Sequence, residues 1–247
     1  GQVFFFVDEF TNYNDVTIGI KAIEVLYRLG YLVNFADHVE SGRAALSKGL
    51  LPFAKECAIS NVNTFATIIK DESPLIGIEP SAILTFRDEY PRLVHNHQKQ
   101  DAQRISKNCM LFEEFLYNEF TAGRISQELF TSETKTIKIQ GHCHQKSLSS
   151  TDFSAWALQL PKNYMVDIIP SGCCGMAGSF GYEAEHYDVS MKVGELVLFP
   201  AVRNASEDTI IAAPGTSCRH QIKDGTSKSA YHPAEILFDA LLPIEKI

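Results

Sequence analysis

The sequence predicts an α/β fold made of two similar tandem α/β modules, each with an open and mostly parallel sheet. Two observations predict it. Short β-rich apolar runs alternate with longer segments of helical periodicity, and the same order of elements occurs twice. A chain of 247 residues with 45% hydrophobic and 21% charged residues can bury a sizeable core. We therefore expect one module at residues 1–125 and a second at residues 126–247.

The first module begins with a buried strand and continues with alternating helices and strands. The helix at 16–29 is expected to end at Gly30, a residue that favours the backbone closing a helix, and Pro52 suits the first turn of the helix at 51–69. The predicted strands are 3–7, 31–35 and 74–78, and the predicted helices are 16–29, 51–69, 81–90 and 98–120. The polar segment 121–135 is expected to connect the modules.

The second module repeats this order and suggests an internal duplication. Its predicted strands are 136–140, 164–169 and 209–213, and its predicted helices are 152–159, 182–199 and 232–242. Residues 7–12 align with 141–146, residues 38–48 with 171–181, and residues 74–84 with 210–220. A period of about 130 residues indicates two small domains rather than a solenoid of short repeats.

The alignment separates the two modules chemically, because the cysteines it covers all fall in the second one. Cys143, Cys173, Cys174 and Cys218 lie opposite Glu9, Glu40, Ser41 and Ala82. Each of the four cysteines follows a predicted strand, and the loops after parallel strands share one edge of a sheet. We therefore expect three separate segments to bring four thiols to one place.

Four thiols in one place can hold either an iron–sulfur cluster or a structural zinc ion. The short C-x-x-C pairs typical of zinc ribbons are absent. Side chains of adjacent residues diverge, so Cys173 and Cys174 suit a multi-iron group better than two corners of one tetrahedron. The glycines at 172, 175, 178 and 181 would let backbone N–H groups approach such a group.

Each of these residues also has a simpler interpretation. Cys57 and Cys109, alone on predicted helices, are expected to be small buried hydrophobes. A disulfide between Cys173 and Cys174 would need a strained ring, and a metal-free thiol–disulfide exchanger is a further alternative. His142, His144, Glu9 and Glu40 are expected to bond locally or to be solvated rather than bind a metal. Two interpretations fit Arg43, Lys48 and Arg219 equally well, which are binding of an anionic substrate and surface salt bridges.

Composition and motifs exclude several other functions. The formal net charge of −8 without a long basic run argues against nucleic-acid binding, and no apolar run is long enough for a transmembrane segment. Neither G-x-G-x-x-G, a Walker lysine nor a nucleophile elbow is present. The chain starts at Gly1 with no secretory signal, so we expect an excised region or separate subunit that is cytoplasmic, or peripheral at the inner membrane.

Four motifs resemble a known family. C-H-Q-K at 143–146, S-G-C-C-G-M-A-G-S-F-G at 171–181, G-T-S-C-R-H-Q-I at 215–222 and H-P-A-E-I-L at 232–237 are similar to the cysteine-rich CCG domain. That domain occurs in the heterodisulfide reductase B subunit and in iron–sulfur subunits of glycolate oxidase, anaerobic glycerol-3-phosphate dehydrogenase and lactate-utilisation proteins. V-D-E-F-T-N-Y-N-D and E-P-S-A-I-L-T-F-R-D-E-Y look like the C-terminal region of FAD-linked oxidases of the D-lactate dehydrogenase type.

The resemblance implies a [4Fe–4S] cluster, or zinc in some members, held by Cys143, Cys173, Cys174 and Cys218. It implies an electron-transfer part of an oxidoreductase that works with a flavin-containing domain or subunit and a ferredoxin-like domain, and that reduces a quinone or a disulfide. One cluster is expected rather than two, because the first module lacks the cysteines. No flavin-binding signature or ferredoxin motif is present, so FAD is expected only on a partner. The first module is expected to dock a partner domain.

Overall fold

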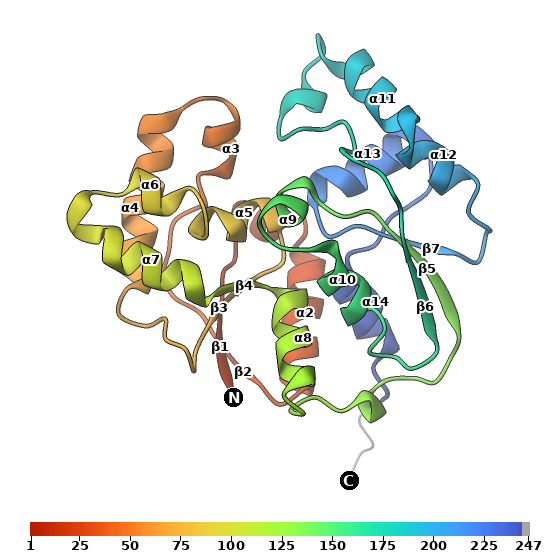
Figure 1. The fold of residues 1–247 in the computed structure, drawn as a ribbon, viewed down its shortest axis with the longest axis horizontal. Helices are drawn as coiled ribbons and strands as arrows, with labels where there is room; N and C mark the ends of the chain where they lie inside the picture. The colour runs from red at the N-terminus through yellow and green to blue at the C-terminus, as the bar shows by residue number, and fades with distance from the viewer. Residues whose placement is uncertain (244–247) are drawn as a thin grey trace.

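The computed structural model describes residues 1–243 and contains two separate parallel sheets. The four-stranded sheet has the order β2-β1-β3-β4 and the three-stranded sheet has the order β6-β5-β7, with every neighbouring pair parallel (Figure 1). The strands are β1 Gln2–Phe5, β2 Leu32–Asn34, β3 Leu75–Gly77, β4 Cys109–Leu111, β5 Lys135–Ile139, β6 Tyr164–Ile168 and β7 Ile210–Ala212. The predicted α/β class with two open parallel sheets is confirmed.

The two sheets share a strand arrangement that matches the sequence alignment. In the first sheet β1 lies between β2 and β3, and in the second β5 lies between β6 and β7. A short helix follows each central strand: α1 (Glu9–Tyr13) after β1 and α9 (Cys143–Leu148) after β5. The aligned residues Glu9 and Cys143 are therefore both the first residue of a helix at the same edge of a sheet.

Helices cover both faces of each sheet. Those up to residue 121 are α1, α2 Val16–Arg28, α3 Arg43–Ser47, α4 Leu51–Phe65, α5 Pro80–Ile83, α6 Tyr90–Leu93, α7 Lys99–Asn108 and α8 Phe112–Thr121. Those after it are α9, α10 Thr151–Ala157, α11 Tyr187–Leu196, α12 Leu198–Arg203, α13 Thr216–Thr226 and α14 Pro233–Ala240. Four short 3₁₀ turns complete the described part: η1 Leu84–Phe86, η2 Asn96–Gln98, η3 Gln127–Leu129 and η4 Phe180–Tyr182.

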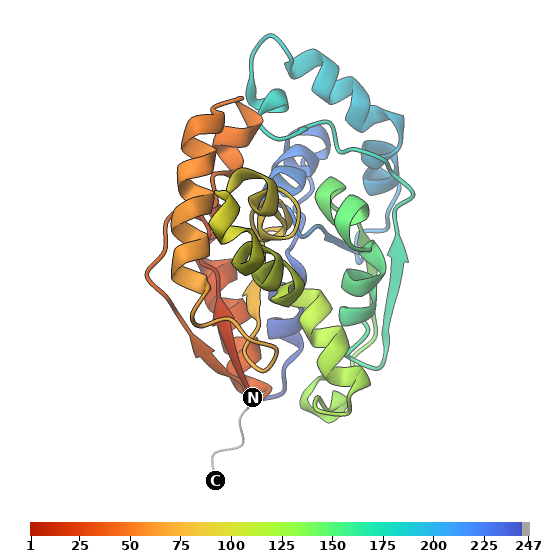
Figure 2. The same ribbon diagram turned by 60° about the vertical axis from the view of Figure 1, so that its left-hand side comes forward.

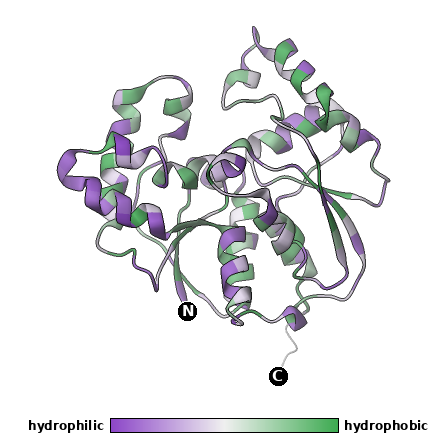
Figure 3. Ribbon diagram, in the orientation of Figure 1, coloured by the Kyte–Doolittle hydropathy of each residue, from purple (hydrophilic) through white to green (hydrophobic). Residues whose placement is uncertain are grey.

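One helical layer lies between the sheets and is common to both halves of the chain. It contains α2 and α8 from the first half and α10 and α14 from the second (Figures 1 and 2). Alternating strand residues divide between this layer and the outer ones: Val3 and Phe5 belong to the central hydrophobic cluster, and Phe6 to the outer cluster beneath α4 and α7. Figure 3 shows hydrophilic and hydrophobic residues interspersed on the outer helices and along the strands of the second sheet.

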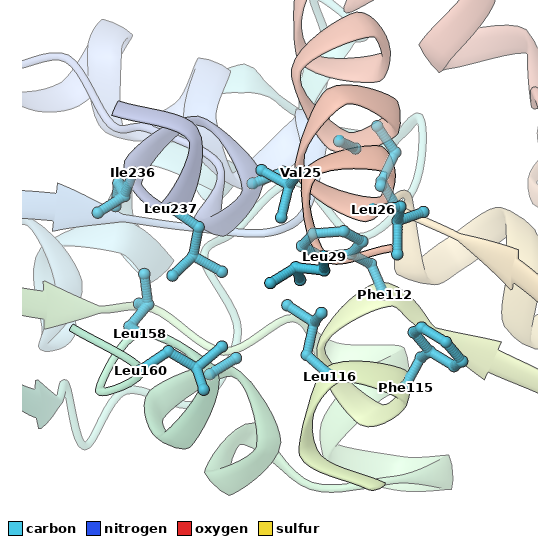
Figure 4. Close-up of a cluster of buried hydrophobic side chains, with 14 of the residues drawn as sticks. Val25, Leu26, Leu29, Phe112, Phe115, Leu116, Leu158, Leu160, Ile236 and Leu237 are labelled. Carbon is cyan, nitrogen blue, oxygen red and sulfur yellow. The ribbon is translucent and has the colours of Figure 1, made fainter. Parts of the chain in front are cut away.

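The central cluster joins the two halves through direct packing. Figure 4 shows Leu26, Phe112 and Leu116 from the first half facing Leu158 and Leu237 from the second. All five side chains are completely buried and belong to one continuous cluster. A third cluster, which includes Phe199 and Ile222, packs α12 and α13 on the outer face of the second sheet. The protein therefore has an outer core on each sheet and one core between the sheets.

The prediction of one helix over 98–120 was wrong. Helix α7 ends at Asn108, the chain forms β4, and α8 starts at Phe112. The Glu114 carboxylate accepts the backbone N–H of Leu111 at 2.9 Å, and this bond begins the second helix. Cys109, expected on a helix, is therefore the first residue of an edge strand that pairs with β3.

Two other predicted helices are interrupted. The segment 81–90 becomes α5, η1 and the start of α6, and Pro91 lies in the first turn of α6, where proline is tolerated. The segment 182–199 becomes η4, α11 and α12, with Val197 between the last two. Pro200 cannot donate a backbone bond to the preceding turn and its ring crowds that turn. The helix predicted at 51–69 ends at Phe65, and α1, α3, α9 and α13 were missed.

None of the helices in residues 1–243 is long and apolar enough to cross a bilayer. The last four residues of the module predicted at 126–247 lie outside the described residues.

Glu113 on α8 is buried without compensation. The side chain is 0% exposed and neither carboxylate oxygen has a hydrogen-bond partner within residues 1–243. Burial, together with the nearby Glu114 and Glu79 charges, raises its pKa to about 7. The pKa of Glu113 is thus about 7 in the folded protein and about 4.3 in the unfolded chain. Between these pH values the folded state binds the proton more tightly, so stability is lost as the pH rises from about 4.3 to about 7.

Glu113→Gln should therefore stabilise the protein more at pH 8 than at pH 5. The stabilisation by Glu113→Gln at pH 8 should exceed the stabilisation at pH 5 by about 2–3 kcal/mol. This is about 1.4 kcal/mol for each pH unit between pH 5 and the folded-state pKa of Glu113. Urea unfolding of both proteins at the two pH values measures it, and pH effects of other groups cancel in the difference. Equal differences at pH 5 and pH 8 would show that Glu113 keeps an ordinary pKa.

Candidate functional site

All four predicted cysteines line one cavity of about 460 Å³, here called the thiol cavity. Cys143 is the first residue of α9 after β5, Cys173 and Cys174 lie in the loop after β6, and Cys218 lies on α13 after β7. The sulfurs of Cys174 and Cys218 are 3.6 Å apart. The structure brings the four thiols together as the strand pattern predicts, but Cys143 and Cys218 lie on helices rather than in plain loops.

The thiols differ in exposure and in charge preference. Cys143 is exposed and Cys173 half-buried, whereas Cys174 and Cys218 are 3% and 1% exposed. Hydrogen bonds from Cys143 and Cys174, with the Gly175 N–H at 3.3 Å, hold the pKa of Cys173 well below its usual range. The bond to Cys173 is also the main cause that raises the pKa of Cys143 and of Cys174. The four thiols therefore favour a single thiolate at Cys173, which accepts hydrogen bonds from Cys143 and Cys174.

The loop of Cys173 and Cys174 needs glycine at two positions. Gly175 and Gly178 have φ values of +107° and +71°, a region that other residues rarely adopt. A Cβ at Gly175 would lie 2.2 Å from the Ser190 carbonyl oxygen, and one at Gly178 would lie 2.3 Å from the Ser47 hydroxyl oxygen. A side chain at Gly175 or Gly178 would therefore clash with protein atoms. An added Cβ at Gly172 would meet no atom within 4 Å.

The first half of the chain supplies part of the cavity wall. Its contribution comes from α1, α3 and the start of α5, and the residues are Phe10, Arg43, Ala44, Ser47, Glu79 and Ser81. Ser47 on α3 accepts the backbone N–H of Ser179 at 3.0 Å, which joins the two halves at the cavity wall. The thiol cavity is thus formed by both halves, although only the second half carries cysteines that line it.

The basic residues near the loops are engaged in ion pairs, which is one of the two interpretations that the sequence left open. Arg43 contacts Glu89 at 2.7 Å, and Lys48 pairs with Glu183. Arg219 pairs with Asp15 at 2.5 Å, and in this pair Arg219 is buried and Asp15 half-buried, so it is not a surface salt bridge. It joins α13 of the second half to the start of α2 in the first.

The two histidines that flank Cys143 bond locally. The His142 Nδ1 atom accepts the backbone N–H of His144 at 3.2 Å and caps α9, while its Nε2 atom lies 4.0 Å from the Glu79 carboxylate. Burial lowers the pKa of His142. His144 lies 3.1 Å from Arg43 and 3.5 Å from Glu89. These contacts match the predicted local role.

At the corresponding edge of the first sheet, side chains bond directly to each other. The Glu9 carboxylate accepts the Ser41 backbone N–H at 2.8 Å and its hydroxyl at 2.7 Å. Tyr90 donates its hydroxyl to the Ser41 carbonyl at 2.9 Å. Glu40 is exposed, and Ala82 is completely buried. Of the four positions aligned with the cysteines, Glu9 and Ser41 therefore bond to each other, and the Glu9 carboxylate is locally bonded as expected.

Cys57 and Cys109 are 3% and 1% exposed and pack as the small hydrophobes that were predicted. Burial raises the pKa of each thiol to about 11. All six cysteines are free thiols, including the adjacent Cys173 and Cys174.

Glu79 was missed by the sequence analysis. It lines the thiol cavity, is 4% exposed, and contacts Thr216 of the second half. The only signal in the sequence was its position after a predicted strand and before Pro80, which is typical of a residue that begins a helix.

The donor set suits a metal-containing group, but the thiols do not surround a single point. Within residues 1–243 no group of three or more His, Cys, Asp or Glu side chains is placed to hold one metal ion. The fold and the cavity define an α/β protein whose distinctive feature is four thiols from three segments at the junction of its halves.

No protein-family model matches the chain. Over 236 residues it is 25% identical to D-2-hydroxyglutarate dehydrogenase of Escherichia coli (strain K12), covering 95% of this chain and 22% of that protein. Over 244 residues it is 26% identical to the C subunit of anaerobic glycerol-3-phosphate dehydrogenase from the same strain, covering 97% of this chain and 59% of that relative. The chain therefore spans about a fifth of the first relative and about three fifths of the second.

The relatives are dehydrogenases, and one of them is a single subunit of its enzyme. A further relative, D-2-hydroxyglutarate dehydrogenase of Haemophilus influenzae, is 23% identical over 240 residues, covering 97% of this chain and 23% of that protein. The similarity thus extends over nearly the whole chain, including both sheets and the thiol cavity.

Proposed function

We propose that this chain is the iron–sulfur electron-transfer part of an oxidoreductase, with Cys143, Cys173, Cys174 and Cys218 as the ligands of one [4Fe–4S] cluster. The observation that carries the proposal is the meeting of four thiols from three segments on one cavity. Thiolates are the usual ligands of iron–sulfur clusters. When bound, the cluster would supply one-electron chemistry, and the protein would supply ligation and a partly water-excluded cavity.

The arrangement of the thiols supports a cluster over the alternative, a structural zinc ion. Zinc requires four ligands at about 2.3 Å from one point. The four thiols line a cavity of about 460 Å³, and no three donors within residues 1–243 are placed around one such point. The Gly175 N–H that points at the Cys173 sulfur is the kind of contact that tunes the potential of a cluster.

The electrons would come from a flavin on a partner domain or subunit, with a ferredoxin-like domain as a second partner, and would go to a quinone or disulfide. The similarity to two kinds of dehydrogenase supports an oxidoreductase role. The chain matches only part of each relative, which supports operation within a larger protein or complex. We also propose that residues 1–125 form a thiol-free module and residues 126–247 the module that carries the ligands.

Metal and acid-labile sulfide, measured on protein purified without oxygen, test the proposal. We expect about four iron atoms and four sulfides per chain, with a broad visible absorption that bleaches on reduction. One equivalent of zinc without sulfide, unchanged after anaerobic iron reconstitution, would instead establish the structural zinc site. Rapid loss of free thiols on mild oxidation of a metal-free protein would establish a thiol–disulfide exchanger.

A further inference from the structure

Glu79, from the half of the chain without site cysteines, contacts elements that carry two of them. It is the residue that begins α5, where its Oε1 atom accepts the backbone N–H of Ser81 at 3.0 Å and the Ser81 hydroxyl at 2.6 Å. Its other oxygen, Oε2, accepts the backbone N–H of Thr216 at 2.8 Å. Thr216 is the first residue of α13, the helix of Cys218.

The second of these bonds replaces a cap that α13 lacks. The residue before α13 is Gly215, which has no side chain, and no side-chain cap is formed there. The first N–H groups of a helix need acceptors from outside it, and a carboxylate is favoured at that end. Glu79 therefore fulfils for α13 the role that an N-cap residue of its own sequence would have.

The same carboxylate also faces the element that carries Cys143. The Nε2 atom of His142 lies 4.0 Å from the Oε1 atom of Glu79. Since the Nδ1 atom of His142 accepts the N–H of His144, the proton of a neutral ring is on Nε2 and points toward the carboxylate. His142 also packs closely against Gly215, where an added Cβ would lie 2.4 Å from the His142 Cδ2 atom. The starts of α9 and α13 thus meet at Glu79.

The environment favours an ionised carboxylate despite complete burial. Burial by itself raises the pKa of Glu79, but the bonds from Ser81 and Thr216 and the nearby Arg219 guanidinium lower it, with a net lowering. Asp15 strengthens the same junction, since its carboxylate binds both Arg219 and the Thr216 hydroxyl. The start of α13 is therefore held by two carboxylates from the other half of the chain.

We propose that Glu79 is a positioning residue that sets the placement of Cys143 and Cys218 by joining the starts of α9 and α13. The first half of the chain, in this view, is required for the geometry of a site to which it contributes no thiol. The inference rests on the proposed function for what the thiols bind. It makes its own prediction for the metal-free protein.

The test compares Glu79→Gln with Glu9→Gln, which makes the same chemical change at a carboxylate bonded only within the first half. The amide cannot accept with both atoms, so one N–H donor at the junction loses its partner. We expect iron to be lost to a ferrous chelator about 10–100-fold faster from Glu79→Gln than from Glu9→Gln, as for other residues that orient metal ligands. In the metal-free proteins, we expect Cys218 to react with iodoacetamide faster in Glu79→Gln than in Glu9→Gln. Mass spectrometry of the peptide that contains Cys218 measures the rate of alkylation.

A second pair of variants isolates, by comparison, the loss of the N–H donor and guards against a folding defect at Glu79. Thr216→Pro lacks the N–H that Glu79 accepts, and proline is well tolerated at the first position of a helix. Thr216→Val keeps that N–H and loses only the hydroxyl. We expect Thr216→Pro to behave like Glu79→Gln, and Thr216→Val to show the smaller effect.

The outcomes separate the two proposals. If the wild-type protein binds no iron but Cys218 becomes more reactive in Glu79→Gln and Thr216→Pro, the iron–sulfur function fails and the positioning role stands. If the wild-type protein binds iron, and both iron loss and alkylation are the same in Glu79→Gln as in Glu9→Gln, the positioning role is overturned.

Discussion

Replacing Cys174 with serine should lower the iron content of anaerobically purified protein by more than about tenfold, whereas folding should be retained. Cys174 is 3% exposed and its sulfur lies 3.6 Å from that of Cys218, so it lies in the most enclosed part of the thiol cavity. A serine hydroxyl is a harder and less acidic ligand than a thiol, and iron–sulfur clusters select soft thiolate ligands. Iron and sulfide analysis measures the effect, and circular dichroism shows whether the fold remains.

The matched control is Cys57→Ser, which places the same hydroxyl at another buried cysteine. Cys57 is also 3% exposed, but it lies on α4 in the first half and does not line the thiol cavity. Its replacement should cost some stability and leave the iron content near that of the wild type. Full iron content in Cys174→Ser would exclude Cys174 as a ligand and contradict the proposed site.

Phe112→Ala should destabilise the protein by about 3–5 kcal/mol, the range for removing a large aromatic side chain from a core. Phe112 is completely buried in the cluster that both halves share. Since whole domains are stable by only about 5–15 kcal/mol, the loss removes a large share of the stability and should shift the urea midpoint far down. Urea unfolding monitored by Trp156 fluorescence and by circular dichroism measures it. Trp156 lies on α10 and contacts Tyr117 and Phe120 of α8, so it reports on the junction.

A shared core also predicts one unfolding transition for both halves. The fluorescence and circular dichroism curves should coincide, in the wild type and in Phe112→Ala. The control is Phe53→Ala, because Phe53 is 45% exposed at the start of α4 and its loss should change stability by less than about 0.5 kcal/mol. Two separated transitions, or a folded fragment of residues 1–125, would show that the halves are independent.

The sequence was sufficient for the parts of this structure that depend on local pattern. Short apolar runs separated by helical segments predicted both parallel sheets, and loops after parallel strands share an edge, so the meeting of Cys143, Cys173, Cys174 and Cys218 was predictable. The aligned positions Glu9 and Cys143 were matched correctly, because the helix that follows the central strand is present in both halves.

Other parts depend on contacts between distant segments, and local pattern does not encode them. Helix α13 was missed because its buried face is mostly polar: Arg219 bonds to Asp15, and Gln221 bonds to Ser190. A search for apolar periodicity does not find such a helix. The contact of Glu79 with Thr216 spans 137 residues and needs both sheets in place. The strand β4 was missed because its three residues lie between two helical patterns and are fixed by pairing with β3.

The unequal exposure of the four cysteines has a consequence for how a bound group would be damaged. Cys143 lies at the solvent side of the thiol cavity, and Cys174 and Cys218 lie at its closed side. Dissolved oxygen or a chelating agent would therefore reach the Cys143 side first, and the other three sulfurs would be attacked later. Under the proposed ligation, Cys143 would be the ligand most open to such damage, and Cys173, Cys174 and Cys218 would be the residues that could still hold the group.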